Sequence, residues 1–534
     1  MSTRIARGLA LTLGLGALIA APAQAHGWSG RPFLTPGDLL LSESTYTPAE
    51  IQPGVTELPP GCTGSNCMAA VADGTFPYVF NNDNADGNFG VSSKVFLDEL
   101  TPWGQPIATI PVPDHQFVTS FSSKSEMALN LSPEGRYVSF VGYVARPAML
   151  DVSNANTPGV IDPGNPDPGP YYRVVAQLDR LGRFTFTETN AYSGDNGRAA
   201  ITSDEDGADL IYAAGNAGQS KTPPNGVILG AGAQFITPSL APEADQSPGQ
   251  PTPLGSFNIT ELGVPADKFS KDNNFRGITI FDNVVYYTKG SGGNGINTVY
   301  FVDTTGKACP SGVGLPEPGA QLPTSPLAYD PSVLQTQGVK PNNMCILKGL
   351  PTNLATSTTM FPFGMWFANA HTLYVADEGS GDNTYSTTTG QYTNATAAAQ
   401  PAAGLEKWVF DSSSGSWHLA YTLQDGLNLG QPYTIPGYPT GDNAATGLPW
   451  APATDGLRAL TGRVNRDGTA TIWAVTSTVS GGGDQGADPD KLVAINDPVG
   501  AITVDPSESF STVRTAEFGQ VLRGVSFTPG TDSH

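Results

Sequence analysis

The sequence predicts an all-β protein assembled from one small antiparallel sheet that recurs along the chain. Its 63 glycines and 46 prolines are spread between runs of β-branched and aromatic residues, where they are typical of turns. Charged residues make up only 14% of the 534 residues, and long amphipathic helical patterns are hard to find. A four-stranded sheet of this size, repeated without helices, is the signature of a β-propeller.

The clearest copy of the repeat is the stretch 456–479, GLRALTGRVNRDGTATIWAVTSTV. Ala459–Val464 is predicted as one strand and Thr469–Thr478 as the next. The polar residues between them end in Asp467-Gly468, a dipeptide that strongly favours a tight hairpin turn. We interpret this hairpin as the first two strands of a blade.

Weaker copies of the hairpin give the number of blades. The inner strands are expected to begin near residues 126, 198, 276, 363, 457 and 523. Third strands are expected at 298–303, 405–410 and 491–495, and fourth strands at 183–187, 417–423 and 514–518. Six blades are favoured. Seven blades stay open because 26–125 and 304–360 are long enough to contain another, and a pair of β-sandwiches is a weaker alternative.

The two ends of the chain are predicted to share a blade. Arg523–Thr528 is an inner strand with no partner after it, and Gly37–Thr47 has the pattern of a second strand with no inner strand before it. Pairing them would close the ring and leave no exposed sheet edge. Further strands are expected at 76–81, 93–97 and 105–112, and Pro/Gly-rich inserts at 147–170, 238–253, 310–341 and 379–401 should form rim loops.

Residues 1–25 have the features of a secretory signal peptide. Arg4 and Arg7 precede the apolar stretch Leu9–Ala20, which is too short to span a bilayer, and Ala23-Gln24-Ala25 fits a cleavage site. We therefore expect a single propeller domain over 26–534, without a membrane span, that is secreted to the periplasm or out of the cell.

The four cysteines fit an oxidising compartment. Cys62 and Cys67 bracket a short loop, and Cys309 and Cys345 bracket a Pro/Gly-rich insertion, so the pairs 62–67 and 309–345 are the simplest of three connectivities. A zinc site is the rival interpretation, although the sequence has neither a CxxC spacing nor a nearby histidine. The net charge of −22 and the pI of about 4.4 argue against nucleic acid and anionic lipid as partners.

Arginine stands at the entry to the inner strand in four of the six repeats. These arginines are Arg198, Arg276, Arg458 and Arg523, and Glu126 and Phe363 take the same place in the other two. Inner strands line the central channel of a propeller, so these side chains should converge at one of its mouths. Guanidinium groups form bidentate bonds with carboxylates and phosphates, which predicts a site for a small anionic ligand.

A purely structural alternative explains the same arginines. An aspartate precedes three of them, namely Asp195, Asp272 and Asp455. Each arginine could pair with the aspartate of its own blade and so hold neighbouring blades together. A repeated structural ion pair accounts directly for the repeated Asp-Arg pattern, and it is favoured over ligand binding on the sequence alone.

Two further features could carry chemistry. His115, in a connector on the arginine side, could act as a general base with Asp114 or Glu126, although a loop histidine without a role is the simpler interpretation. The loop around Asp83 and Asp86 is dense in oxygen ligands for calcium, but its twelfth position is Ser93 where an EF-hand needs a bidentate glutamate. No cofactor is certain from the sequence, and calcium is the candidate.

The phrases RGITIFDNVVYYTKG, PFGMWFANAHTLYVADEG and GLRALTGRVNRDGTATIWAVTST resemble blades of secreted bacterial β-propeller proteins, a largely uncharacterised group. They are similar, more loosely, to the propellers of lactonases and phytases. The resemblance covers most of 120–530 at the level of repeats, and it implies the fold rather than a set of catalytic residues. Phytase-like propellers bind phosphate at a calcium cluster on the channel face.

Two hypotheses for function follow. The favoured one is a secreted propeller that binds a small anionic ligand, or a protein or glycan partner outside the cell, on its channel face or rim loops without catalysis. The alternative is a calcium-dependent secreted hydrolase of phosphate esters or lactones, in which the four arginines hold the anion. The two differ in whether unpaired carboxylates line the channel.

Overall fold

The computed structural model of the protein describes residues 33–47, 51–65, 67–70, 89–121, 126–167, 169–204, 209–216, 232–239, 274–290, 296–308, 312–316, 321–324, 344–353, 360–482 and 485–532. These residues form an all-β protein whose main sheets are the six blades of a β-propeller. The prediction of six blades is therefore confirmed, and neither seven blades nor a pair of sandwiches is needed.

Each blade begins with its inner strand, and the other strands follow from the inside outward. Blade 1 comprises β29 (Gln520–Phe527), β1 (Leu39–Thr45), β4 (Ser92–Leu100) and β5 (Pro106–Pro111), with the short β6 (Thr119–Ser120) beside β4. Blade 2 comprises β7 (Asn130–Leu131), β8 (Tyr137–Tyr143), β9 (Arg173–Asp179) and β10 (Phe184–Thr189). Blade 3 comprises β11 (Gly197–Ser203), β12 (Leu210–Gly215) and β13 (Ala233–Ile236).

The second half of the ring has the same order. Blade 4 comprises β14 (Phe275–Phe281), β15 (Val284–Lys289), β16 (Thr298–Val302), β18 (Met344–Leu347) and β17 (Val313–Gly314). Blade 5 comprises β19 (Pro362–Asn369), β20 (Thr372–Asp377), β23 (Gly404–Asp411) and β24 (Ser416–Leu423). Blade 6 comprises β25 (Ala453–Val464), β26 (Thr469–Val479), β27 (Lys491–Pro498) and β28 (Ser511–Thr515).

Short elements decorate the blades. They are the hairpins β2 (Glu57–Leu58) with β3 (Met68–Ala69) and β21 (Tyr385–Ser386) with β22 (Gln391–Tyr392), and the 3-10 turns η1 (Val152–Asn154), η7 (Thr393–Ala395) and η8 (Gln485–Ala487). Among the described residues, no helix has the length and hydrophobicity needed to cross a membrane. The strand expected at 76–81 lies outside the described residues.

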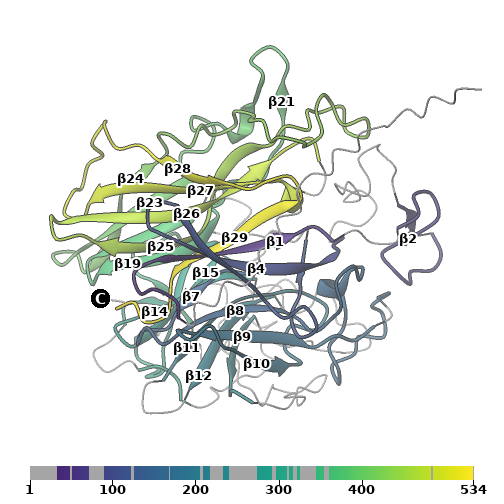
Figure 1. The fold of residues 1–534 in the computed structure, drawn as a ribbon. Helices are drawn as coiled ribbons and strands as arrows, with labels where there is room; N and C mark the ends of the chain where they lie inside the picture. The colour runs from purple at the N-terminus through teal and green to yellow at the C-terminus, as the bar shows by residue number, and fades with distance from the viewer. Residues whose placement is uncertain are drawn as a thin grey trace, which may run out of the picture.

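The two ends of the chain close the ring, as the sequence predicts. Figure 1 shows the yellow β29 lying beside the purple β1, and the two strands pair antiparallel from Leu39 with Phe527 to Thr45 with Gln520. The inner strands also contact one another in sequence all the way round, from β29 through β7, β11, β14, β19 and β25 and back to β29. The central sheet edges are thereby covered by neighbouring blades.

The hairpin of blade 6 follows its sequence closely. β25 and β26 are joined by the tight turn 465–468, in which Gly468 has a φ of +85°, a value that a glycine adopts without strain. Both strands extend further toward the channel entry than the hydrophobic pattern indicates, because Ala453 and Thr454 also pair with the end of β26.

Apolar contacts between successive blades hold the ring together. Between blades 4 and 5, the Phe367 ring lies 4.6 Å from that of Phe281 and 4.7 Å from that of Tyr286. Between blades 6 and 1, Trp473 meets Phe527 edge-on at 5.5 Å. Burial of such large aromatic side chains between sheets is the main source of stability in a fold of this kind.

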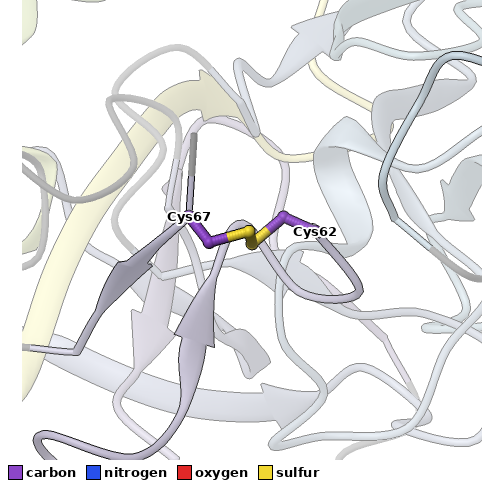
Figure 2. Close-up of a disulfide and its surroundings, with 2 residues drawn as sticks. All are labelled: Cys62 and Cys67. Atoms are coloured by element: carbon purple, nitrogen blue, oxygen red, sulfur yellow. A yellow bond between two sulfur atoms is a disulfide. The ribbon is translucent and has the colours of Figure 1, made fainter. Parts of the chain in front are cut away.

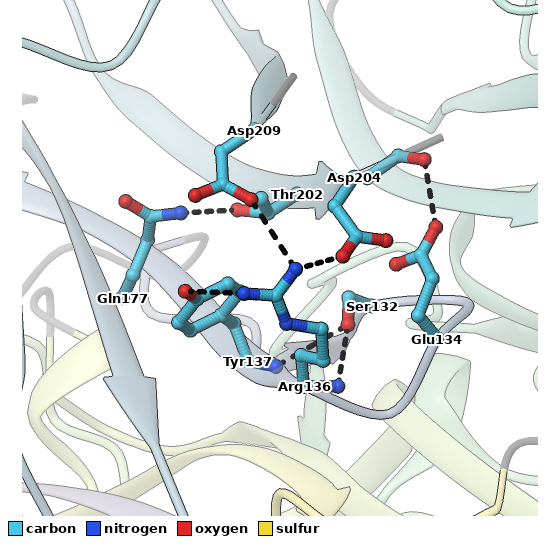
Figure 3. Close-up of polar contacts among 9 residues, drawn as sticks. Ser132, Glu134, Arg136, Tyr137, Gln177, Thr202, Asp204 and Asp209 are labelled. Atoms are coloured by element: carbon cyan, nitrogen blue, oxygen red, sulfur yellow. Dashed lines mark hydrogen bonds and ion pairs between the residues drawn. The ribbon is translucent and has the colours of Figure 1, made fainter. Parts of the chain in front are cut away.

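Polar contacts also stabilise the interfaces between blades, at the opposite end of the inner strands from the arginines. Figure 3 shows Arg136, in the turn between β7 and β8, pairing with Asp204, the residue after β11. Arg136 also lies 3.9 Å from Asp209, the residue before β12. Ser203 donates a hydrogen bond to Glu134 in the same contact, at 2.9 Å. Blades 2 and 3 are thus joined by charges at this rim.

A fully buried ion pair joins blades 5 and 6. Lys407 on β23 donates to Asp497 on β27 at 2.7 Å, and both side chains are 0% exposed. The ammonium group also donates to the carbonyl oxygen of Pro498 at 2.6 Å and to the hydroxyl of Tyr421 at 3.0 Å. Its three hydrogen-bonding positions are therefore all used, which is the condition under which a buried cation is tolerated.

Cys62 and Cys67 form a disulfide beside the β2–β3 hairpin, as the sequence predicts (Figure 2). Cys309 lies outside the described residues, so its pairing with Cys345 stays a prediction.

Candidate ligand-binding site at the channel mouth

The four arginines occupy the same structural position, which is a β-bulge in the inner strand. The register between the first and second strands shifts at Arg198, at Arg276, at Arg458 and at Arg523, and it shifts at Phe363 in blade 5. A bulge inserts one extra residue, bends its strand and changes the direction of the side chain it carries. The entry position recognised in the sequence is thus a real and repeated backbone feature.

The residue that follows each bulge is small because the next blade lies directly against it. A Cβ atom added to Gly277 would clash with the carbonyl oxygen of Phe363, and one added to Gly524 would clash with that of Met127. Arg198 and Arg458 are followed by alanines that are at most 4% exposed. The bulges of successive blades therefore pack against one another around the channel.

The guanidinium groups of these arginines are close enough that their charges shift one another's pKa. Burial, together with the charges of Arg198 and Arg458, lowers the pKa of Arg276 from 12.5 to about 9, while Glu378 opposes the shift. Burial also lowers the pKa of Arg523, to about 10, with a contribution from Arg458. These mutual effects place all four arginines in one electrostatic cluster drawn from blades 1, 3, 4 and 6.

Two of the four arginines are held by hydrogen bonds to the neighbouring blade. Arg198 donates to the side chain of Asn274 and, at 3.1 Å, to the carbonyl oxygen of Phe275. Arg458 pairs with Glu378 of blade 5, with Nε 3.2 Å from the carboxylate.

Arg523 bonds within its own blade, and the described partners are neutral groups. It donates to the hydroxyl of Ser44 at 3.0 Å, to the carbonyl oxygen of Ser120 at 3.1 Å and to the carbonyl oxygen of Phe121. Arg198 and Arg458 thus join blades, but through Asn274, a carbonyl oxygen and Glu378 instead of the aspartates of their own blades.

Arg276 differs from the other three. It makes no hydrogen bond or ion pair with any described residue, and its Nε is buried without a partner. Another buried arginine, Arg173, shows how a buried guanidinium is normally stabilised. It donates hydrogen bonds to four backbone carbonyl oxygens, those of Tyr171, Ser153, Ala155 and Asp195. The half-buried Arg276 is therefore an uncompensated cation beside two others.

The two described aspartates, Asp195 and Asp455, accept hydrogen bonds from neutral donors. Asp195 accepts from the amide of Asn216 and, at 2.8 Å, from the backbone N–H of Asn196. Asp455 accepts from Gln400 at 2.6 Å and from the N–H of Gly381 at 2.8 Å. Burial raises the pKa of Asp455 to about 6.

Glu126, which takes the arginine position in blade 2, is held in the same way. Its carboxylate accepts from Thr119 at 2.6 Å, from the N–H of Ser120 at 3.0 Å, from Asn196 at 2.8 Å and from the hydroxyl of Tyr143.

Two acidic residues of the mouth are not among those predicted from the sequence. Glu378, which directly follows β20, supplies the carboxylate of blade 5, where the inner strand carries Phe363 instead of an arginine. Asp490, just before β27, accepts from the N–H of Leu522 at 2.8 Å, and burial raises its pKa to about 8 although Arg458 and Arg523 oppose the shift. Glu378 follows a second strand and Asp490 precedes a third strand, so the pattern of inner strands does not reveal them.

Among the remaining predicted residues, those that the structure describes do not join this cluster. His115 is exposed, and Asp114 beside it pairs with Lys94 at 3.0 Å. Asp272, Asp83 and Asp86 lie outside the described residues, so the calcium loop around the last two stays a prediction. Within the described part of the chain, the one group of metal-ligand types in close proximity is Glu57 with Cys62 and Cys67, whose sulfurs are already joined.

The comparisons with known proteins identify no family for this chain. No protein-family model and no curated protein matches the chain. Among solved structures, the chain is similar to a mutant of the Synechocystis apocarotenoid oxygenase, with 9% identity, a TM-score of 0.22, and coverage of 82% of this chain and 59% of that one. It is also similar to an ulvan lyase of polysaccharide lyase family PL25, with 10% identity, a TM-score of 0.27, and coverage of 93% and 96%. The chain thus spans less than two thirds of the oxygenase, and likeness at this level carries no argument about activity.

Proposed function

We propose that the protein binds a small anionic ligand, with a carboxylate or phosphate group, at the arginine mouth of the propeller channel, and that Arg276 is the group that receives the anion. The observation that supports this most directly is the guanidinium of Arg276, which has no partner among the described residues and lies beside two like charges. A bound anion would supply the missing hydrogen-bond acceptor and the missing negative charge together.

The geometry favours an anion over a cation as the ligand. Three carboxylates of the mouth, Asp195, Asp455 and Glu126, already accept hydrogen bonds from amides, hydroxyls or backbone N–H groups. Glu378 pairs with Arg458. A calcium ion at this place would have to break several of those bonds and would sit against three guanidiniums. The calcium-dependent hydrolase is the less supported alternative, because these carboxylates are engaged in bonds. Oδ2 of Asp490, which is buried without a described partner beside Arg458 and Arg523, is the carboxylate oxygen that would favour it.

Titration calorimetry of the purified protein with acetate and with inorganic phosphate tests the proposal. We expect saturable binding of at least one anion at low ionic strength, weakened by salt because the interaction is between charges. The substitution Arg276→Met should abolish binding. Arg136→Met, at the opposite rim, is the matched control and should leave binding unchanged.

Hydrolysis can be followed in the same samples with chromogenic phosphate esters and lactones, with and without a chelator. Turnover that a chelator abolishes would favour the hydrolase. Anion binding that persists in Arg276→Met would remove the basis of the proposed site.

A further inference from the structure

Three buried polar atoms without described partners lie at or near Arg198, whose charge acts on Arg276. They are Nε of Arg198, Oδ1 of Asn216 and the hydroxyl of Tyr192, in residues that are 4%, 6% and 0% exposed. Buried polar groups in native proteins are nearly always hydrogen-bonded, so a local group of unpaired ones needs an explanation. All three belong to blade 3 or to the segment that leads into it.

The surroundings fix the direction of each atom. The amide nitrogen of Asn216 donates to Asp195, so its oxygen must face the other way and can only accept a hydrogen bond. The Tyr192 ring packs against Gly197 and Gly215, the residues next to Arg198 and Asn216 in the sequence, so a Cβ at either glycine would crowd it.

Tyr192 is also held in an unusual backbone conformation. Its φ is +61°, in the left-handed region that a bulky side chain rarely adopts. Burial raises the pKa of the Tyr192 hydroxyl while the charge of Arg198 opposes the shift, which places this hydroxyl near the guanidinium. Strain of this kind is common where a side chain is positioned for a ligand.

We infer that the anion is a hydroxylated carboxylate of the sugar-acid class, seated off the channel axis over blade 3. Its carboxylate would bind Arg276 and Nε of Arg198. Its hydroxyl groups would donate to Oδ1 of Asn216 and exchange a hydrogen bond with the hydroxyl of Tyr192. A simple anion satisfies the guanidiniums but leaves these two neutral groups unpaired. This inference rests on the proposed function, because it names the ligand class of the same site.

Calorimetry with three probes tests the inference, namely D-glucuronate, acetate and D-glucose. D-glucuronate should bind at least about tenfold more tightly than acetate, since a site built to pair with a hydroxyl discriminates against a ligand that lacks one. D-glucose, which has the hydroxyls without the charge, should bind more weakly than D-glucuronate.

Tyr192→Phe removes only the hydroxyl and should reduce the preference for D-glucuronate over acetate several-fold while acetate binding stays the same. It should not lower the stability of the free protein, because the lost group has no partner among the described residues. Tyr438→Phe, which removes a hydroxyl bonded to Asp488 at 2.5 Å, is the control and should leave the preference unchanged.

The outcomes separate this inference from the proposed function. Equal affinity for D-glucuronate and acetate, with both lost in Arg276→Met, would overturn the sugar-acid ligand and leave the anion site standing. Loss of stability in Tyr192→Phe without a change in preference would show that buried water, not a ligand, satisfies the hydroxyl, and would also overturn it. Absence of binding by any anion would overturn both.

Discussion

Replacing Arg276 by methionine should make the ligand-free protein more stable. Methionine keeps much of the apolar length of the side chain and removes the charge. The guanidinium has no partner among the described residues, and burial together with Arg198 and Arg458 lowers its pKa from 12.5 to about 9. Because the pKa of this base is lower in the folded than in the unfolded state, the charge destabilises the fold at every pH below about 9.

The size of the effect follows from the same shift. At about 1.36 kcal/mol for each pH unit, lowering the pKa to about 9 corresponds to an upper limit of about 5 kcal/mol. Arg276 keeps partial exposure, and solvent screening reduces the contribution, so we expect a gain of about 1–3 kcal/mol in the free energy of unfolding at pH 7. Urea denaturation followed by tryptophan fluorescence measures it.

Arg523→Met is the matched control, since it makes the same substitution at the equivalent bulge. That guanidinium donates to two backbone carbonyl oxygens and a hydroxyl, and its loss leaves buried acceptors unpaired. The pKa of Arg523 is also lowered, to about 10, so removing its charge offsets part of that penalty. We expect a net cost of about 1–2 kcal/mol, opposite in sign to the change at Arg276. If both variants lose stability to a similar extent, then Arg276 is satisfied in the free protein and the argument for a ligand at this position is refuted.

Two further predictions concern other buried charges. Lys407→Met should lower the free energy of unfolding by about 3–5 kcal/mol, because it leaves Asp497 charged and buried, and Lys407→Met combined with Asp497→Leu should recover most of that loss in the same urea assay. Three buried carboxyl groups have raised pKa values in the folded protein, about 7 for Glu43 and Asp377 and about 8 for Asp490. The folded protein therefore retains protons that the unfolded chain releases above about pH 4. Stability should therefore fall as the pH rises from 5 to 8, and Asp490→Asn should reduce that fall by about 1–3 kcal/mol; an unchanged pH profile in this variant would contradict the assignment.

The architecture was predictable because each blade repeats the same local pattern. In blade 6 the Asp-Gly turn and the β-branched runs on either side of it determine two strands that pair with each other. The spacing of the copies of this hairpin then gives the number of blades. Closure by the two termini was also predictable, since Arg523–Thr528 and Gly37–Thr47 each lack a partner within their own part of the chain. The structure confirms this pairing between β29 and β1.

The hydrogen-bond partners at the mouth could not be predicted in the same way. The Asp-Arg repetition suggests ion pairs within a blade, yet Arg458 pairs with Glu378 of the neighbouring blade and Asp455 with Gln400. Contacts between blades depend on how the sheets twist and pack, and a bulge changes the direction of the side chain by an amount that the sequence does not state. Glu378 and Asp490 were missed for this reason.

The departures from symmetry, more than the repeat itself, mark where a ligand would bind. Six equivalent bulges that all carried an arginine and its acceptor would give a symmetric, fully compensated ring. Instead, blade 5 replaces its arginine by Phe363 and lends Glu378 to Arg458, while the described residues of blade 4 provide no acceptor for Arg276. The unpaired positive charge therefore lies off the axis, on the side where Tyr192 and Asn216 also carry atoms without described partners. An asymmetric arrangement of unpaired groups is expected for a ligand-binding site, because a structural ring would have been stabilised by filling every position alike.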